Sequence, residues 1–290
     1  MQRNIVEVSR IFFTGLGQIM LQCSPVTGAL FLIGISLNSP VMAVGASLGT
    51  IVGMAAGGFL KLSPENQKNG LYGFNAALVG IAAFCFFPLS AWSLLLLVGG
   101  AFLSVVVMET MMRHLRVPPY TAPFILVTWG LLWVGRVIPL APAHTGNGYS
   151  WLPDLPLGGL TGLGQVMFQE NALSGAFFLV GILACSKLRG LWALAGSLIA
   201  GAIAVASGQP GVKVAMGLFG YNAALTALAL SSIAVPAFVV MIGAALTVPL
   251  VLASAALNIS PLTAPFVIAT WLTVMFLKLT RKVGSMSTQP

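Results

Sequence analysis

Two glutamines occupy matching places in a stretch of sequence that occurs twice. Residues 15–22 read Gly-Leu-Gly-Gln-Ile-Met-Leu-Gln, and residues 162–169 read Gly-Leu-Gly-Gln-Val-Met-Phe-Gln. Each stretch is apolar, interrupted by glycine and too short to cross a bilayer, so we expect a re-entrant half-helix. The ends of a helix leave peptide groups without partners, and these groups could bind a polar solute together with Gln18 and Gln165. A connector lying on the membrane surface is the alternative interpretation.

Two threonines and two prolines form a second matched set. The segment Thr-Ala-Pro-Phe stands at 121–124 and again at 263–266, and a Thr-Trp pair follows both copies. Proline removes a backbone donor and frees a carbonyl one turn earlier, while threonine adds a hydroxyl that donates or accepts. The motif therefore predicts polar groups at Thr121 and Thr263. The other interpretation is a kinked helix whose threonine bonds its own backbone.

A third matched pair of segments carries an aromatic residue and a leucine at helical spacing. Residues 71–78 recur as residues 218–225. The four side chains are Phe74, Leu78, Tyr221 and Leu225. Because residues four apart share one face of a helix, each pair could form a wall of a slot for a flat molecule. Ordinary helix packing is the alternative, and we expect the adjacent Asn75 and Asn222 to tie helices together.

The chain is a tandem duplication. The first and third matched segments are offset by 147 residues and the second by 142, in the same order in both copies. Each copy contains five apolar segments of about the length that a bilayer requires. In the first copy they are 26–38, 40–60, 70–88, 91–112 and 120–139; in the second they are 173–186, 190–207, 214–231, 235–257 and 262–280.

The composition is that of a membrane protein. Hydrophobic residues make up 58% of the 290 residues and charged residues 6%, against roughly 25% charged residues in soluble domains. The net charge of +8 comes from basic residues at the ends of apolar segments, so we expect a lipid partner and no nucleic-acid partner. We expect no cleaved signal peptide, because glycines and Gln18 break the first apolar run and no cleavage site follows.

The basic residues predict the orientation. With the N-terminus in the cytoplasm, eleven basic residues face inward and two, Arg136 and Lys213, face outward, as the positive-inside rule requires. Both termini are then cytoplasmic and the second copy is inverted, in a bacterial inner membrane. The predicted divisions are an N-terminal segment (1–14), the first repeat (15–140), an external connection (141–161), the second repeat (162–282) and a C-terminal tail (283–290).

The carboxylates and cysteines exclude several functions. No carboxylate falls in the middle of a predicted span, where proton relays and ion-coupling sites usually place one. The three cysteines are scattered, without metal-ligand or disulfide spacing. We therefore expect no enzyme, no catalytic residue, no metal and no cofactor. The prediction is an all-α membrane protein of about ten spans and two half-helices, with two inverted five-helix repeats around a central pore.

These motifs resemble those of the urea transporter family. The family signature Leu-Pro-x-x-Thr-x-Pro-Phe appears at 117–124 with valine first, and at 259–266 with isoleucine first and Ser260 in place of the first proline. The resemblance extends over nearly the whole chain, twice. It implies a homotrimer with one pore per protomer, and passive, channel-like transport of urea.

The resemblance also implies roles for individual residues. Gln18 and Gln165 would open the two half-helices and offer oxygens to urea. Backbone carbonyls near Ile19, Leu21, Val166 and Phe168 would continue two ladders of acceptors. Phe74, Leu78, Tyr221 and Leu225 would form apolar walls, with Thr121 and Thr263 at the midpoint. The family usually has phenylalanine where this chain has Leu21 and Tyr221, so the resemblance leaves the wall geometry and the solute preference open.

Three alternatives remain open. A channel for another small neutral solute, such as ammonia, water or a short amide, would use similar walls, although an ammonia channel more typically has histidines within its spans. An ion-coupled secondary transporter shares inverted repeats, but it needs an intramembrane charge. The third is an enzyme embedded in the membrane.

Overall fold

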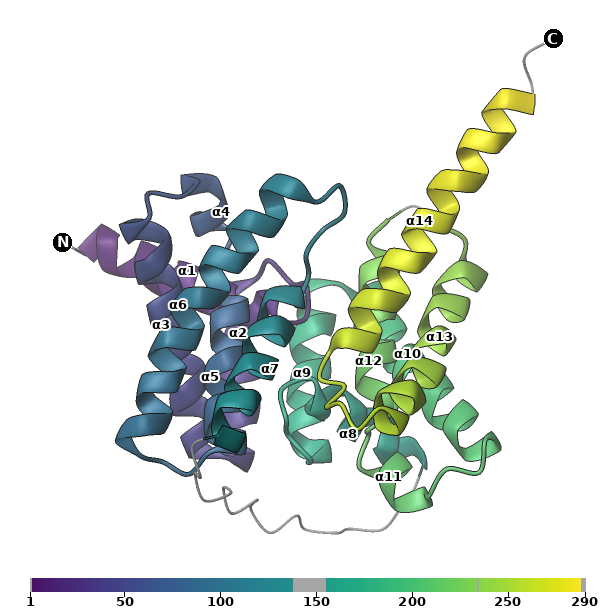
Figure 1. The fold of residues 1–290 in the computed structure, drawn as a ribbon, viewed down its shortest axis with the longest axis horizontal. Coiled ribbons are helices and arrows are strands. Elements are labelled where there is room, and N and C mark those ends of the chain that lie inside the picture. The colour runs from purple at the N-terminus through teal and green to yellow at the C-terminus, as the bar shows by residue number, and fades with distance from the viewer. Residues whose placement is uncertain (1, 138–154, 234, 288–290) are drawn as a thin grey trace.

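The computed structural model describes residues 2–137, 155–233 and 235–287 of the chain, and these ranges contain helices and no strand (Figure 1). The first seven helices are α1 (Gln2–Gln18), α2 (Pro25–Asn38), α3 (Pro40–Phe59), α4 (Pro64–Lys68), α5 (Phe74–Phe86), α6 (Ala91–His114) and α7 (Ala122–Val137). The next seven are α8 (Leu155–Gln165), α9 (Ala172–Cys185), α10 (Lys187–Ala206), α11 (Gly211–Ala215), α12 (Gly220–Ser231), α13 (Ala237–Ala256) and α14 (Ala264–Ser287).

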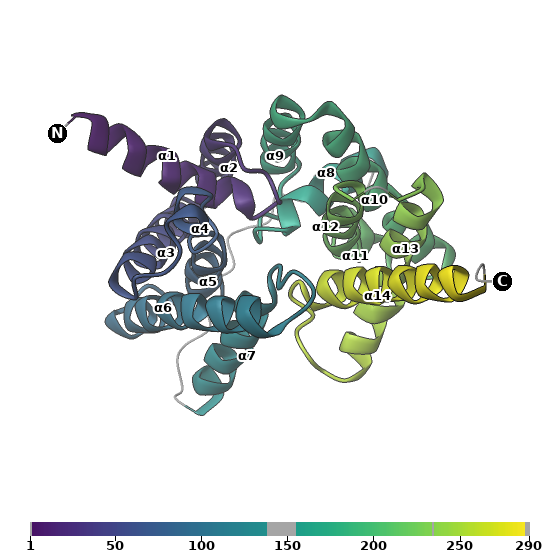
Figure 2. The ribbon, with the colours of Figure 1, turned by 90° about the horizontal axis from the view of Figure 1, so that it is seen from above.

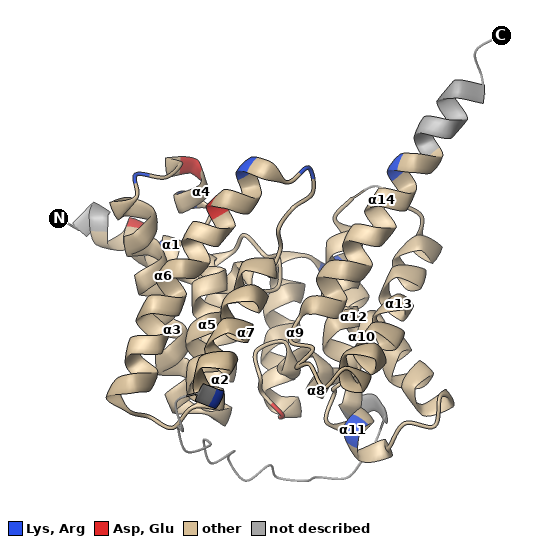
Figure 3. Cartoon of the chain, viewed as in Figure 1, with Lys and Arg blue, Asp and Glu red and all other residues tan. Residues whose placement is uncertain are grey.

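Four helices in the described part of the chain, α3, α6, α10 and α13, are long and apolar enough to cross a membrane. Shorter apolar helices stand at five of the six other predicted spans, and the 12-residue helix α12 stands at the sixth, 214–231. Figure 3 shows that charged residues gather toward the two ends of the helices, with α4 at one end and α11 at the other. This distribution fits a bundle whose middle is surrounded by lipid.

Hydroxyl and amide side chains fix where several of these helices begin. The Ser39 side chain accepts the N–H of Met42 at the start of α3, and Ser90 forms a reciprocal capping box with Ser93 at the start of α6. Such caps satisfy donors that the first turn of a helix leaves free. They place both starts at the predicted boundaries, residues 40 and 91.

Helix α1 differs from the prediction. It runs without a break from Gln2 to Gln18, so Gly15 lies inside its last turn and begins no separate half-helix. Glycine serves close packing here: a Cβ on Gly17 would come within 2.6 Å of the carbonyl oxygen of Gln22. Similarly, α8 already starts at Leu155, within the predicted external connection, whose residues 141–154 lie outside the described residues. Helix α14 continues to Ser287, beyond the predicted end of its span.

Helices α3 and α5 pack with their backbones in contact. A Cβ on Gly45 would meet the carbonyl oxygen of Gly80 at 2.4 Å, and a Cβ on Gly49 would meet that of Ala76 at 2.2 Å. Helices α10 and α12 repeat this arrangement, with Gly196 against Ala223. Small residues thereby let helices approach closely where lipid offers no hydrophobic driving force.

Helices α2 and α9 join the two halves of the chain, which lie side by side in Figure 2. The Thr27 hydroxyl donates to the carbonyl of Gly181 at 2.7 Å. The residues 147 positions away make the reciprocal bond, in which Ser174 donates to Gly34 at 2.7 Å. One buried cluster of apolar side chains extends across both halves, so the interface between them belongs to the core.

Candidate functional site

Helices α1 and α8 end in the same unusual turn. Leu21 and Phe168 each have a φ of 60°, the left-handed conformation. The N–H of Gln22 reaches back to the carbonyl of Gly17 at 3.1 Å, and the equivalent bond after α8 measures 3.0 Å. This is the Schellman pattern, in which the left-handed residue is usually glycine. A larger residue there costs roughly 1 kcal/mol, and strain of this kind concentrates at functional sites.

The two turns leave a set of backbone acceptors without donors. The amide of Gln22 donates to the carbonyl of Met20 at 2.7 Å, and Gln169 likewise bonds Met167. No described residue donates to the carbonyls on either side of these two methionines. Those free carbonyls belong to Ile19, Leu21, Val166 and Phe168. They are the residues to which the family resemblance assigns acceptor carbonyls, and they come in two matched pairs.

Gln18 and Gln165 occupy the last positions of α1 and α8. The prediction that they open half-helices is therefore wrong. The chain reaches each glutamine at the C-terminal end of a helix, where carbonyl groups are the unsatisfied ones. This reversal explains why the turn presents acceptors. The sequence could not give the direction, because the glycines that bound the motif are compatible with either end of a helix.

The two glutamines differ in their partners. The Gln18 Nε2 donates to the carbonyl of Asn69 at 2.9 Å. The Gln165 Nε2 is buried and has no hydrogen-bond partner in the described part of the chain. No described residue donates to either side-chain oxygen, so each amide keeps an acceptor free.

Asn75 and Asn222 hold the starts of α7 and α14. The Asn75 Oδ1 accepts the N–H of Phe124 at 3.2 Å, and its Nδ2 donates to the carbonyl of Tyr120 at 3.2 Å. Asn222 makes the same two bonds with Phe266, at 3.0 Å, and with Leu262, at 3.2 Å. Each asparagine thus satisfies both a donor and an acceptor at a helix start, and it ties helices together as expected.

The proline of each Thr-x-Pro motif lies in the first turn of its helix. Helix α7 begins at Ala122 and α14 at Ala264, so Pro123 and Pro265 are second residues. A proline there removes an N–H that the helix would not use, so it starts the helix without a kink. The carbonyl one turn before Pro123 is taken, because Pro119 accepts the N–H of Ala122. The predicted free carbonyl is therefore absent.

The two motif threonines bond each other. The Thr121 and Thr263 hydroxyls are 2.7 Å apart and buried, and either can be the donor. Neither bonds its own helix backbone, which was the alternative interpretation. Cross-bonds flank the pair: the Trp129 indole donates to the carbonyl of Ser260 at 2.8 Å, and Trp271 donates to that of Pro118 at 2.9 Å.

The predicted wall residues are brought together. Phe74, Leu78, Tyr221 and Leu225 are all buried in one apolar cluster with Ile19 and Val166, against which Leu21 and Phe168 pack. The centroid of the Phe168 ring, from the second half, lies 5.5 Å from the ring centroid of Phe86 and 6.3 Å from that of Phe124, both of the first half. The turn after α8 therefore rests against α5 and α7 of the first half.

Two further hydroxyls were missed by the sequence analysis. Thr128 and Thr270 are buried, and their hydroxyls have no hydrogen-bond partner among the described residues. Other buried helical threonines, such as Thr50 and Thr226, donate to the carbonyl four residues earlier. Thr128 and Thr270 lie seven residues after the motif threonines, on the same helix face. The sequence signal that could have identified them is their recurrence at an offset of 142, the same offset that relates Thr121 to Thr263.

The buried polar groups of the described residues are all uncharged amides and hydroxyls. The ion pair between Glu109 and Arg113 is partly exposed at the end of α6. A cavity of about 160 Å³ lies elsewhere, beside Trp129 and Arg136, and none of the predicted site residues lines it. Such an interior can hydrogen-bond a neutral solute but offers no counter-charge to an ion.

Comparisons with known proteins agree with this chemistry. The profile of a protein family described as urea transporter matches residues 9–278. Mouse urea transporter 1 is 27% identical over 238 residues, which cover 74% of this chain and 61% of the relative. Urea transporter 1 of sheep is 26% identical and that of rat 27% identical, with the same coverage. The alignments thus span about 61% of the length of these curated relatives.

Proposed function

Because the chain belongs to the urea transporter family, we propose that it conducts urea passively across a membrane, through a narrow slot between its two halves. The observation that carries the proposal is the matched set of free backbone carbonyls at the ends of α1 and α8. These four acceptors belong to Ile19, Leu21, Val166 and Phe168, and they stand next to the free side-chain oxygens of Gln18 and Gln165.

Urea fits this arrangement chemically. It is flat and neutral, and it carries four N–H donors and one carbonyl. Removing its water without replacement would cost several kcal/mol. A row of carbonyl and amide oxygens along its edge replaces those hydrogen bonds, while apolar walls from Phe74, Leu78, Tyr221 and Leu225 contact its faces. An ion would lose its hydration shell and find no opposite charge.

The midpoint contributes hydroxyls that can change partner. Thr121 and Thr263 satisfy each other through their mutual hydrogen bond. Because a hydroxyl both donates and accepts, each can exchange its partner for the carbonyl or an N–H of urea. The unpartnered hydroxyls of Thr128 and Thr270 extend this set. Several weak sites in series allow a solute to leave as readily as it enters.

The proposal includes a topology and an assembly. Ten spans in two inverted repeats put both termini in the cytoplasm of a bacterial cell, in its inner membrane, and the matched contacts of the two halves support this arrangement. The excess of basic residues at the predicted inner ends supports the orientation. A homotrimer with one pore per protomer follows from the family resemblance.

Reconstitution into liposomes tests the substrate. Vesicles with the protein should take up urea much faster than empty vesicles, while glycerol, which is not flat, should enter at the rate of empty vesicles. Equal urea rates with and without the protein would refute the proposal. Permeation of ammonia, water or short amides in place of urea would identify the alternative channel.

A further inference from the structure

The loop between α4 and α5 lies against the end of α1. Gly70 has a φ of +71°, and a Cβ there would meet the backbone nitrogen of Gly15 at 2.5 Å. The second half repeats this contact: a Cβ on Gly217 would meet the nitrogen of Gly162 at 2.3 Å. The close backbone approach is therefore common to both halves, and it brings each loop next to a turn that carries free carbonyls.

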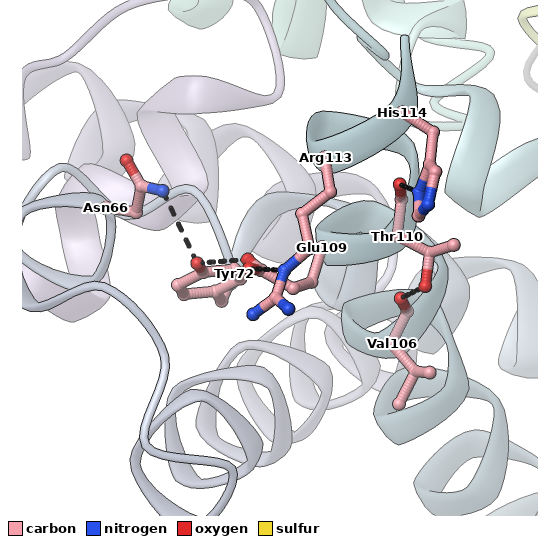
Figure 4. A network of polar contacts seen from close by, with 7 residues as sticks. All are labelled: Asn66, Tyr72, Val106, Glu109, Thr110, Arg113 and His114. Atoms are coloured by element: carbon pink, nitrogen blue, oxygen red, sulfur yellow. Dashed lines mark hydrogen bonds and ion pairs between the residues drawn. The ribbon is translucent and has the colours of Figure 1, made fainter.

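A polar network holds this loop in the first half (Figure 4). The Tyr72 hydroxyl donates to Glu109 Oε2 at 2.7 Å, and the other oxygen of Glu109 accepts from Arg113 Nε at 2.7 Å. Asn66 Nδ2 donates to the Tyr72 hydroxyl at 3.4 Å. A phenol bonded to a carboxylate forms a short, charge-assisted hydrogen bond, so the link between the loop and α6 is strong.

The second half replaces this network with apolar packing. The offset of 147 that relates the loops puts Phe219 at the position of Tyr72, and the offset of 143 that relates the buried faces of α6 and α13 puts Leu252 at the position of Glu109. Phe219 belongs to a buried apolar cluster, and Leu252 packs against that cluster. The hydroxyl and the carboxylate are thus replaced together, and the fold of the second half does without them.

The held loop contacts a residue of the proposed pore. Asn69 stands between Asn66 and Tyr72, and its carbonyl accepts the amide of Gln18 at 2.9 Å. In the second half, Met216 takes the place of Asn69, and the amide nitrogen of Gln165 has no partner among the described residues. The two glutamines are therefore inequivalent: one amide is fixed in orientation and the other can turn.

We propose that Tyr72 and Glu109 are positioning residues for urea transport, which act by fixing the Asn69 carbonyl and, through it, the orientation of the Gln18 amide. The inference rests on the proposed function. With its nitrogen committed to Asn69, Gln18 presents its oxygen to the N–H groups of urea. The free Gln165 amide can present either its oxygen or its N–H, so the two ends of the pore differ in chemistry.

A double-mutant cycle tests this inference. Tyr72→Phe should lower urea flux in proteoliposomes roughly two- to tenfold, the range that follows from losing the ordinary hydrogen bond between Gln18 and the Asn69 carbonyl. In a Gln18→Leu background the same substitution should have no further effect, because the residue through which Tyr72 acts is gone. Unchanged flux in Tyr72→Phe, or the same factor in both backgrounds, would overturn the inference.

Two further variants control for misfolding and for unspecific effects of a substitution in α6. Tyr72→Phe combined with Glu109→Leu introduces the apolar pair that the second half has in Phe219 and Leu252, so it should fold and show the same loss as Tyr72→Phe alone. Thr110→Val is the control: Thr110 is exposed and bonds the carbonyl of Val106 in its own helix, so its flux should equal that of the wild type.

A second readout separates this inference from the proposed function. Cys23 is exposed, and its Sγ lies 3.9 Å from Asn69 Oδ1. In a background with Cys85→Ser and Cys185→Ser, a maleimide should alkylate Cys23 faster in Tyr72→Phe than in Thr110→Val. A wild type that does not conduct urea would refute the proposed function. Equal alkylation rates of Cys23 in the two variants would overturn the positioning role, whatever the urea flux.

Discussion

The hydroxyls of Thr121 and Thr263 lie 2.7 Å apart although 142 residues separate them in the chain. Each stands immediately before the helix that closes its half of the molecule, and each helix start is held by an asparagine from a neighbouring helix. The bond therefore joins the two halves at equivalent points. In the proposed pore it is the midpoint that every solute must pass.

Removing one of these hydroxyls should slow transport. Thr263→Val leaves the Thr121 hydroxyl without a partner in a buried place and takes one hydrogen bond from the solute. We expect urea flux to fall by up to about tenfold, the factor for roughly 1.4 kcal/mol. Stopped-flow urea uptake by proteoliposomes measures it. Thr273→Val is the control, since that hydroxyl bonds its own helix at 2.8 Å. Equal flux in both variants would argue against the role of the midpoint.

Thr270→Val should separate transport from stability. The Thr270 hydroxyl has no partner to lose in the described structure, so its replacement by an isosteric methyl removes an unsatisfied polar group. We expect a thermal midpoint in detergent equal to or above that of the wild type, together with a lower urea flux. A lower midpoint with normal flux would show that the hydroxyl is structural.

Asn222→Ala, in contrast, should lower the thermal stability. It leaves the N–H of Phe266 and the carbonyl of Leu262 without their partners at the start of α14. Each buried unsatisfied group costs about 1–3 kcal/mol, so the thermal midpoint should fall by several degrees. Ser207→Ala, at an exposed site, provides the comparison. A midpoint that stays at the wild-type value would contradict the capping role.

Gly28→Ala should prevent correct packing of α1 against α2. The added Cβ would lie 1.7 Å from the carbonyl oxygen of Phe13, a distance that no side-chain adjustment can relieve. Gly99→Ala, within α6, meets nothing within 4 Å and should be stabilising by up to about 1 kcal/mol, because alanine favours the helix. The yield of monodisperse protein in detergent measures both effects. Similar yields would mean that the two helices do not pack as described.

The sequence predicts the positions of the helices and of the matched site residues well wherever a residue type favours one structural role. The apolar segments predict the helices, and the serines before Pro40 and Ala91 mark where two of them start. The repeated motifs identify the residues that the structure gathers from both halves, among them Thr121, Thr263 and the wall residues.

The sequence does not predict in the same way whether a helix begins or ends at a motif, or which hydrogen-bond partner a side chain has. Glycines around Gln18 and Gln165 indicate close packing, but they do not say whether a helix begins or ends there. A proline such as Pro123 fits a kink or a helix start equally well, and the choice depends on Asn75, which is 48 residues away in the chain. The lack of a hydrogen-bond partner for Thr128 and Thr270 among the described residues can be recognised only when the surrounding atoms are placed.

The most direct test of the central claim is urea flux through the purified protein in liposomes, measured with and without an imposed proton or sodium gradient. The account predicts fast flux that follows the urea gradient, is indifferent to the ion gradients and does not saturate until urea is concentrated. Flux that requires a proton or sodium gradient would contradict a passive slot lined by uncharged groups, because such coupling needs an ion site within the membrane.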